Sequence, residues 1–479
     1  MSAVDRAAPV QIARLSRRLP GSGSDVLTIL SGALRAADIL VVLGASFLAY
    51  WIWHGGFTLP SFYLTPTLLG AILAANFLHI FRVYSPEALR RPALQLGKAT
   101  AAWMIASASL VAIAYFTSTS IIYSRGWAIL WLVLVHLGFI VLRLVAAARV
   151  RRWRRQGLLS ARVAVVGAGE LAALAARQLE DAPDQQYRVV GFFAEPESAG
   201  DLPRKGGIDS LLAAVATNEV DEILVALPWG QGQSLERLLR RLKSVPVNVR
   251  ICPDAALLTR PVRRLPPIAA LPTLDLYERP MSGWNQVLKR IEDLVLAPIL
   301  LLLTLPMSLA IALLIRLDSP GPILFRQRRF GFNNNEFTVY KFRTMRHAPE
   351  DAHVPQARRT DERVTRIGAF LRRTSLDELP QLLNVLRGEM SLVGPRPHAV
   401  AHNRHFAEII DDYLGRHRVK PGITGWAQVN GLRGETRTEE QMRLRVQHDL
   451  HYIDNWSLWL DLKILLLTIF VGFVHENAY

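Results

Sequence analysis

Four long apolar stretches open the chain, near residues 34–53, 64–81, 99–118 and 127–146. Each approaches the roughly 20 residues that an α-helix needs to cross the hydrocarbon core of a bilayer. We therefore predict a membrane α-helical bundle of four transmembrane helices over residues 31–150, with the buried helices of a soluble protein as the alternative. Residues 1–30 mix Arg, Ser, Gly and Pro without the apolar run of a signal peptide, so we expect a flexible cytoplasmic tail.

Basic residues lie at alternate ends of these stretches, which predicts their orientation. They precede the first stretch, separate the second from the third and follow the fourth: Arg14, Arg17, Arg18, Arg35, Arg82, Arg90, Arg91, Lys98, Arg149, Arg151, Arg152, Arg154 and Arg155. The other two loops contain only Arg125. Because cytoplasmic loops are enriched in Lys and Arg, both ends of the bundle are predicted to lie in the cytoplasm.

A different pattern begins at Ala161, where short apolar runs alternate with turn residues. RVAVVGAGELAALAARQL is typical of a strand, a glycine turn and a helix, and YRVVGFF and VDEILVALP are typical of further buried strands. We predict a Rossmann-like α/β domain over residues 160–265, which ends near the proline-rich stretch 261–272.

The glycine turn of this domain resembles a dinucleotide-binding fingerprint, although the match is weak. Gly167, Gly169 and Ala172 stand where glycines and a small residue let a pyrophosphate approach a helix N-terminus. The acidic residue that should bind the ribose would be Glu195, which comes late for that role. The alternative is a regulatory, dimerising or structural domain that only keeps its turn glycines.

An apolar segment broken by prolines, about residues 286–317, opens a third region, predicted to be a mainly α-helical domain over residues 280–479. Pro298 and Pro306 each remove a helical hydrogen bond, so the chain should bend and return to the same side as a re-entrant membrane helix, with Pro306 as the break. Basic residues flank both ends: Lys289, Arg290, Arg316, Arg326, Arg328 and Arg329. A kinked fifth span is the alternative, and it would export the basic region that follows.

The last apolar stretch, WSLWLDLKILLLTIFVGFV, contains Asp461 and Lys463. Charges inside it favour a helix at the membrane interface, or one packed on protein, over another crossing.

Composition narrows the range of partners. The chain has 479 residues, 51% of them hydrophobic, and a net charge of +16. This excess suits phosphate-bearing partners, and membrane helices favour lipids and nucleotides over nucleic acid. Cys252 is the only cysteine, which excludes an intramolecular disulfide and a cysteine metal cluster.

An acidic pair, Asp377-Glu378, stands in RRTSLDELPQLL among many basic residues. The basic residues of this region include Lys341, Arg343, Arg346, Arg363, Arg366, Arg372, Arg373 and Arg396. A helix N-terminus surrounded by arginines can bind phosphate, and a carboxylate there should have a depressed pKa and stay ionised. Such an aspartate can attack phosphorus, while its neighbour can hold a divalent metal against the phosphates. Prolines on both sides of Arg396 would preorganise a phosphate clamp.

The same residues have a structural interpretation. Ser375-x-x-Glu378 matches a helix capping box, and acidic residues in a first turn are favoured by the helix dipole. The arginines could form a solvated or lipid-facing surface. The two interpretations do not exclude each other.

Four segments, LDSPGPILFRQRRFG, YKFRTM, TSLDELPQLLNVLRGEMSLVGPRP and KPGITGWAQVNG, resemble the motifs of bacterial polyprenyl-phosphate glycosyl-1-phosphate transferases. The layout of the whole chain is similar to the large membrane form, of the undecaprenyl-phosphate glucose phosphotransferase type that initiates exopolysaccharide synthesis. This resemblance implies the transfer of a sugar-1-phosphate from a UDP-sugar to undecaprenyl phosphate, with release of UMP and with Mg²⁺. Glucose is the family-level preference and galactose the alternative.

The resemblance also implies roles for single residues. Asp377 would be the nucleophile that forms a covalent phosphosugar intermediate, and Glu378 would assist through the metal. The phosphate-binding residues would be Lys341, Arg343, Arg372 and Arg396, together with Arg363 and Arg366. The expected location is the bacterial inner membrane, with the catalytic domain on the cytoplasmic face, and a homodimer is left open.

Two other function classes fit less of the sequence. A membrane-bound nucleotide-sugar dehydratase or epimerase needs a Tyr-x-x-x-Lys pair after the glycine fingerprint, and none occurs between Ala161 and Pro280. A non-enzymatic scaffold would leave the grouping of Asp377, Glu378 and Arg396 without a reason.

Overall fold

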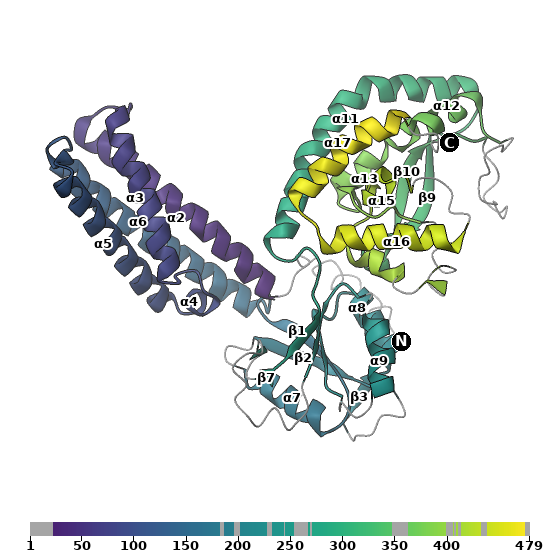
Figure 1. Ribbon diagram of the computed structural model, residues 1–479, viewed down its shortest axis with the longest axis horizontal. Helices are drawn as coiled ribbons and strands as arrows, with labels where there is room; N and C mark the ends of the chain where they lie inside the picture. Colours follow the sequence, from purple (N-terminus) through teal and green to yellow (C-terminus); the bar gives the residue numbers. More distant parts are fainter. Residues whose placement is uncertain are drawn as a thin grey trace, which may run out of the picture. The chain divides into compact units, whose positions relative to one another are not determined.

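The computed structural model describes residues 23–182, 186–195, 202–227, 232–243, 245–252, 267–268, 271–346, 363–398, 406, 409–410, 413–432 and 438–474. The chain divides into two compact units, one up to Ala161 and one from Arg162. The first is a helical bundle, and the second contains a mixed sheet and a further, mainly helical region (Figure 1).

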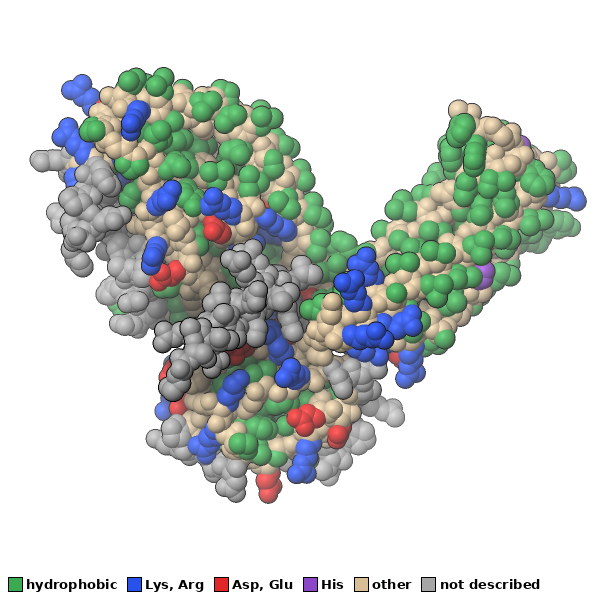
Figure 2. All heavy atoms as spheres, turned by 180° about the vertical axis from the view of Figure 1, so that it is seen from behind, with side chains coloured by type: hydrophobic (Ala, Val, Ile, Leu, Met, Phe, Trp, Pro, Cys, Tyr) green, Lys and Arg blue, Asp and Glu red, His purple; other side chains and the backbone are tan. Residues whose placement is uncertain are grey.

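The bundle consists of four long helices, each long and apolar enough to cross a membrane. They are α2 (Gly23–His54), α3 (Ser61–Ile80), α5 (Pro92–Phe116) and α6 (Arg125–Arg155), with short α4 (Pro86–Arg90) and η1 (Thr119–Ile121) between them. Hydrophobic side chains cover much of the bundle in Figure 2, and Lys and Arg side chains gather towards one end. The four predicted helices are therefore present and membrane-capable, and the bundle has one basic end, as the apolar and charge patterns predict.

The first described helix begins inside the predicted tail of residues 1–30. Helix α2 begins at Gly23, so residues 23–30 belong to the bundle. Leu27 is buried and Leu30 packs against the bundle core, while Asp25 in the first turn complements the helix dipole. Residues 1–22 lie outside the described residues.

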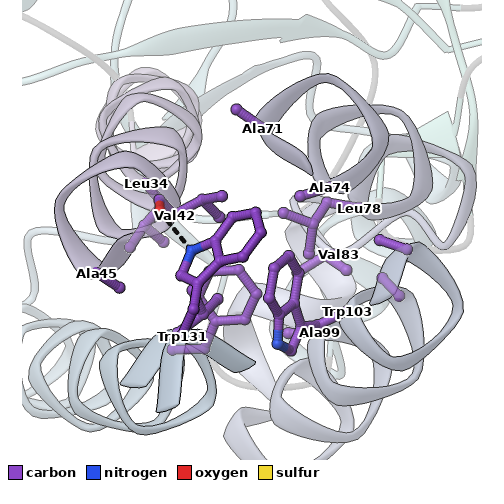
Figure 3. Close-up of a cluster of buried hydrophobic side chains, with 14 of the residues drawn as sticks. Leu34, Val42, Ala45, Ala71, Ala74, Leu78, Val83, Ala99, Trp103 and Trp131 are labelled. Atoms are coloured by element: carbon purple, nitrogen blue, oxygen red, sulfur yellow. Dashed lines mark hydrogen bonds between the residues drawn. The ribbon is translucent and has the colours of Figure 1, made fainter. Parts of the chain in front are cut away.

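Tryptophans from two helices form the centre of the bundle (Figure 3). The indole rings of Trp103 and Trp131 meet edge to face, with centroids 5.9 Å apart. The Trp131 Nε1 donates to the carbonyl oxygen of Val42 at 2.9 Å, which satisfies the polar atom of a buried ring. A Cβ atom at Gly70 would lie 2.6 Å from the Trp131 ring, so this glycine lets helix and ring approach closely.

A buried ion pair also joins the helices. Arg143 Nη2 of α6 donates to Asp38 Oδ2 of α2 at 2.7 Å, and the Tyr84 hydroxyl donates to the same oxygen at 2.7 Å. Charged groups inside a membrane bundle are costly unless they are paired, so this cluster fixes α2, α6 and the chain after α3 against one another.

The α/β domain has a six-stranded sheet in the order β3-β2-β1-β4-β5-β8. The strands are β1 (Ala161–Val166), β2 (Tyr187–Phe193), β3 (Arg204–Gly206), β4 (Glu222–Val225), β5 (Asn248–Ile251) and β8 (Leu274–Tyr277). The helices are α7 (Glu170–Glu180), α8 (Ile208–Ala216) and α9 (Gly232–Leu242), and a small hairpin pairs β6 (Pro267–Ile268) with β7 (Leu271–Pro272).

Strand β1 pairs with β4, β2 with β3 and β4 with β5 in parallel, while β8 at one edge runs antiparallel to β5. Apolar clusters cover both faces, which explains why the strands have continuous apolar runs. The sheet continues to Tyr277, so the predicted boundary at residue 265 was too early. The sequence pattern missed β8 because it is short and follows a proline-rich stretch.

The last region is mainly helical. Its helices are α11 (Trp284–Asp318), α12 (Arg366–Thr374), α13 (Gln381–Arg387), α15 (Trp426–Val429), α16 (Glu439–Asp454) and α17 (Leu458–Val474), with the 3-10 turns η3 (Phe332–Asn334), η4 (Leu376–Glu378) and η5 (Tyr413–Arg418). The hairpin of β9 (Leu324–Phe330) with β10 (Glu336–Phe342) and the parallel pair of β11 (Ser391–Val393) with β12 (Gly422–Thr424) complete it.

Helix α11 bends along its length (Figure 1) but is continuous. Pro298 and Pro306 both lie inside it, so the break predicted at Pro306 does not interrupt the helix. Both ends contact the same domain. Arg290 Nη1 near the start donates to the carbonyl oxygen of Val385 at 2.8 Å, and Ile315 near the end packs with the cluster of β10 and α12.

Helix α17 packs on the rest of the mainly helical region through its charged residue Asp461. Asp461 is fully buried and accepts hydrogen bonds from Lys289 Nζ at 2.6 Å, the Tyr452 hydroxyl at 2.8 Å and Trp456 Nε1 at 2.8 Å. The opposite side exposes large apolar residues such as Trp459. The helix is therefore both packed on protein and apolar on its outer side.

Candidate functional site

The acidic pair lies in η4, between α12 and α13. Ser375 ends α12 in the left-handed region, with φ at 57°, which turns the chain before the pair. Ser375 makes no side-chain cap hydrogen bond to η4, so the predicted capping box does not form. The side chains of Asp377 and Glu378 are instead nearly buried, with 9% and 8% of each residue exposed.

Glu378 is held by two cations. Lys341 Nζ of β10 donates to Glu378 Oε1 at 2.8 Å, and Arg396 Nη1 donates to Oε2 at 3.0 Å, with a second Arg396 bond to Oε1. Burial alone would raise the pKa of Glu378, but the charges of Arg396 and Lys341 hold it well below the usual range. Glu378 therefore remains a carboxylate.

Asp377 is held much less firmly. Its ion-pair partner is Lys341, with Nζ 3.9 Å from Oδ2, and no described residue donates a hydrogen bond to its carboxylate. Burial raises the pKa of Asp377, Lys341 opposes this rise, and the negative charge of Glu378 adds to it. The depressed pKa expected for a carboxylate here therefore holds for Glu378 but not for Asp377, because burial outweighs the cations around Asp377.

Comparison with known proteins assigns this region to a family. Residues 284–475 match the model of the family described as "Bacterial sugar transferase", and residues 79–253 match a "CoA-binding domain". The UDP-glucose:undecaprenyl-phosphate glucose-1-phosphate transferase of Xanthomonas campestris pv. campestris is 37% identical, over 93% of this chain and 94% of its own. The protein of the same name from Escherichia coli (strain K12) is 43% identical, over 73% and 75% of the two chains. This chain belongs to the bacterial sugar transferase family.

A further relative has a different donor sugar in its name. The UDP-N-acetylgalactosamine-undecaprenyl-phosphate N-acetylgalactosaminephosphotransferase of Aeromonas hydrophila is 45% identical over 182 residues, which are 38% of this chain and 43% of the relative. The family model and the Xanthomonas relative confirm the family resemblance that the motifs indicated.

Of the other predicted phosphate-binding residues of the sugar transferase domain, Arg372 lies near the pair. Its Nε donates to the Thr344 hydroxyl at 2.9 Å, and its charge helps to lower the pKa of Asp377 against the larger effect of burial. Arg366 is the first residue of α12, is exposed and makes no ion pair with a described carboxylate. The Arg363 carbonyl accepts from the amide of Arg346 at 2.9 Å.

Arg343 has a structural role in the sugar transferase domain. Its guanidinium donates to the carbonyl oxygens of Pro320 at 2.8 Å and Ser319 at 2.6 Å, at the end of α11. These carbonyls are left without helical partners where α11 ends, and a buried arginine satisfies them. No hydrogen bond or ion pair joins Arg343 to the acidic pair within the described chain, and its role as a phosphate ligand stays a prediction.

Arg329 of the sugar transferase domain was missed as a site residue. It donates to Gln327 Oε1 at 3.0 Å and also to the carbonyl of Pro397, next to Arg396. Burial and the charge of Arg396 lower the pKa of Arg329 to about 10, while the acidic pair partly opposes this. The β9–β10 register could have identified it, because Arg329 and Lys341 lie on one face of the hairpin by the alternation of strands.

The carboxylates available for a metal are few. The described residues contain no group of three or more His, Cys, Asp and Glu side chains that could hold an ion alone. Mg²⁺ often binds through one or two carboxylates and completes its shell with substrate phosphates and water. Asp377 and Glu378 fit such a shared site, and they do not fit an all-protein cage.

The glycines of the α/β domain have a packing reason. Gly167 has φ at +134°, and a Cβ atom there would lie 2.4 Å from the carbonyl oxygen of Ala226. Gly169 is the N-cap of α7, and Glu170 follows it in the first turn, where its charge would repel a phosphate. Glu195 lies 3.5 Å from Arg241 in an ion pair. These contacts explain the fingerprint residues without a dinucleotide.

Proposed function

We propose that this membrane enzyme transfers glucose-1-phosphate from UDP-glucose to undecaprenyl phosphate and releases UMP, as the first step of exopolysaccharide synthesis. Support comes from the relatives of that name, one of which aligns over nearly its whole length. The observation that supports the proposed chemistry is that the cations bind Glu378 closely and Asp377 only at a longer distance. Glu378 is held by Lys341 and Arg396, while the carboxylate of Asp377 is left to react.

In the first half-reaction, an Asp377 carboxylate oxygen attacks the phosphorus that carries the glucose. The new Asp377 O–P bond forms as the bond from this phosphorus to the bridging oxygen breaks, and the electron pair leaves with UMP. In the second half-reaction, an oxygen of undecaprenyl phosphate attacks the same phosphorus. The Asp377 O–P bond breaks, the carboxylate is restored and the lipid pyrophosphate-sugar is released.

The cations around the pair would bind the phosphates. Lys341 and Arg396 bind Glu378, while Arg329 and Arg372 add their positive charge to the surroundings of the pair. Two anionic substrates and two carboxylates repel each other, so this convergence of positive charge is needed to bring them together. Glu378 keeps Lys341 and Arg396 in place before the donor binds.

Mg²⁺ would add to this charge when bound with the donor. Asp377 and Glu378 are the residues of the described chain that would hold it, together with phosphate oxygens. It would supply charge neutralisation on the diphosphate. Glu378 is the better ligand of the two, because its low pKa keeps it ionised.

Helix α11 would be re-entrant and would place the site at the cytoplasmic surface of the bacterial inner membrane. Support comes from the contacts of its two ends with one domain and from its exposed apolar middle, where Leu302 and Leu303 are each 71% exposed. Lipid would cover this part. The lipid phosphate at the membrane surface would then reach Asp377 from the bilayer side.

Selective labelling tests this topology. In a Cys252→Ser background, we expect Arg91→Cys and Arg328→Cys to react with an impermeant thiol reagent from the same side of the membrane. Ser120→Cys, in the η1 turn between two spans, is the control and should react from the opposite side. Reaction of Arg328→Cys together with Ser120→Cys would show that α11 crosses the bilayer.

The α/β domain would be Rossmann-like and structural or regulatory. Its strand order, in which β1 lies between β2 and β4, is that of doubly wound dinucleotide-binding folds. Its glycines are explained by packing, so a nucleotide ligand is not required for them. A homodimer is compatible with this role.

The decisive experiment is a UMP-release assay with purified protein across UDP-glucose, UDP-galactose and UDP-N-acetylgalactosamine, with and without undecaprenyl phosphate. We expect UMP release to be fastest with UDP-glucose, to require the lipid for multiple turnovers and to be lost with a chelator. Faster turnover with UDP-galactose would favour the alternative donor. A lack of UMP release with every donor would refute the proposed reaction.

The pH dependence of kcat/KM should be bell-shaped and narrow. Asp377 must be ionised to attack, and burial raises its pKa. The acidic limb of the profile should therefore lie above the pKa of an ordinary aspartate. Lys341 must be charged, and burial lowers its pKa, so activity should also fall as the pH rises through that value. An acidic limb at the pKa of a free aspartate would contradict this account.

A further inference from the structure

We propose that Arg416 is a positioning residue for the reaction, which holds the main chain of Arg396 so that its guanidinium meets Glu378. The inference rests on the proposed function, because Arg416 would act only through Arg396. No motif in the sequence singled out Arg416, since it stands in RHRVKPG away from the acidic pair.

The Arg416 guanidinium is almost completely buried and has three partners. Its Nη2 donates to the carbonyl oxygen of Arg396 at 2.8 Å, its Nη1 to His398 Nδ1 at 2.8 Å and its Nε to Asp449 Oδ2 at 2.8 Å. Arg396 and His398 are separated only by Pro397, so two of the three bonds fasten the same short segment. The third anchors the guanidinium to α16.

His398 fits this arrangement as a neutral acceptor. Arg416 can only donate, and its Nη1 lies 2.8 Å from Nδ1 and 3.3 Å from Nε2 of His398, so the nearer nitrogen, Nδ1, is assigned as the acceptor. Burial and the charge of Arg416 hold the pKa of His398 well below its usual range, in agreement with the neutral form. The Tyr413 hydroxyl lies 2.6 Å from the same Nδ1 and comes from the same turn, η5, as Arg416.

The segment held by Arg416 is fastened on its other side as well. Arg329 donates to the carbonyl of Pro397. On the N-terminal side of Arg396, strands β11 and β12 pack closely, because a Cβ atom at Gly394 would lie 2.6 Å from the carbonyl oxygen of Lys420. The main chain around Arg396 is thus fixed on both sides. Its guanidinium can then present two nitrogens to Glu378 in one geometry.

Stability alone explains this arrangement poorly. A buried ion pair such as Arg416–Asp449 often contributes no more stability than apolar residues of the same volume would. The surroundings could supply such residues, because Tyr413, Met442 and Val446 form an apolar cluster between η5 and α16. By donating to the carbonyl oxygen of Arg396, the Arg416 guanidinium instead orients a residue that is proposed to bind substrate.

A double-mutant cycle on the full-length enzyme tests the inference, with UMP release from UDP-glucose and undecaprenyl phosphate as the readout. We expect Arg416→Met to lower kcat on the order of 10- to 100-fold, because a small displacement of a catalytic group has this effect. In an Arg396→Lys background the guanidinium fork is absent, so we expect Arg416→Met to lower kcat by less than about threefold. Equal losses in both backgrounds would overturn the inference, because a merely structural role is additive.

Two further variants keep the test valid if Arg416→Met does not fold. Arg416→Lys keeps the charge, but its ammonium cannot reach three separate partners, so we expect an intermediate loss that also disappears in the Arg396→Lys background. Arg443→Met removes an exposed arginine from α16 and should leave kcat within about twofold. A wild-type enzyme without UMP release would refute the proposed function and this inference with it, whereas a working wild type with an additive cycle would refute the inference alone.

Discussion

We expect Asp377→Asn to abolish UMP release, with a loss of at least about 10³-fold, while the protein stays folded and membrane-bound. Asparagine has the same size and shape, but its amide cannot attack phosphorus, so the covalent half-reaction is lost outright. Asp377 accepts no hydrogen bond from the described residues, and Lys341, its ion-pair partner, keeps its hydrogen bond to Glu378 after the substitution. The measurement is single-turnover UMP release from UDP-glucose, together with trapping of labelled donor on the polypeptide.

Two comparisons give this result its meaning. Asp454→Asn makes the same chemical change at an exposed residue of α16 and should leave the rate unchanged within about twofold. Glu378→Gln removes the charge that holds Lys341 and Arg396, and it should slow the reaction while label still accumulates on the chain. Normal UMP release by Asp377→Asn would eliminate the covalent mechanism, and label retained by that variant would move the nucleophile elsewhere.

Local sequence patterns predicted those helices and strands that are determined by the residues within them and next to them. The four membrane helices follow from the length of their apolar runs, and β1 and β4 follow from short apolar runs next to turn residues. Of the residues predicted from the motifs to bind phosphate, Lys341 and Arg396 both bind Glu378 in the structure. These features need no knowledge of distant contacts.

Features that depend on distant contacts were not predictable in this way. The sequence identifies Arg343 as a candidate phosphate ligand because it is a cation within a family motif. Only the fold shows that its guanidinium donates to the carbonyls at the end of α11. The partner of Asp461 is Lys289, which is 172 residues away in the chain. The raised pKa of Asp377 comes from burial, which the neighbouring arginines in the sequence do not reveal.

The second large effect is expected from Lys341→Met, which should lower kcat/KM by about 10²- to 10³-fold, the usual cost of removing one preorganised charge from an active site. Lys341 is the one described residue with an ion pair to both carboxylates, at 2.8 Å from Glu378 and 3.9 Å from Asp377. Without it the pKa of Asp377 should rise further, because Lys341 is the largest influence that opposes burial there.

The variant should therefore lose activity in two ways that kinetics can separate. Weaker binding of phosphate charge lowers kcat/KM at every pH, and the higher pKa of Asp377 moves the acidic limb of the pH profile upwards. The basic limb due to Lys341 should disappear at the same time. Arg328→Met is the matched control, because this arginine lies on the opposite face of β9 with its side chain 81% exposed. If the acidic limb of the Lys341→Met enzyme did not move, Lys341 would not control the ionisation of Asp377. The proposed influence of Lys341 on the nucleophile Asp377 would then be wrong.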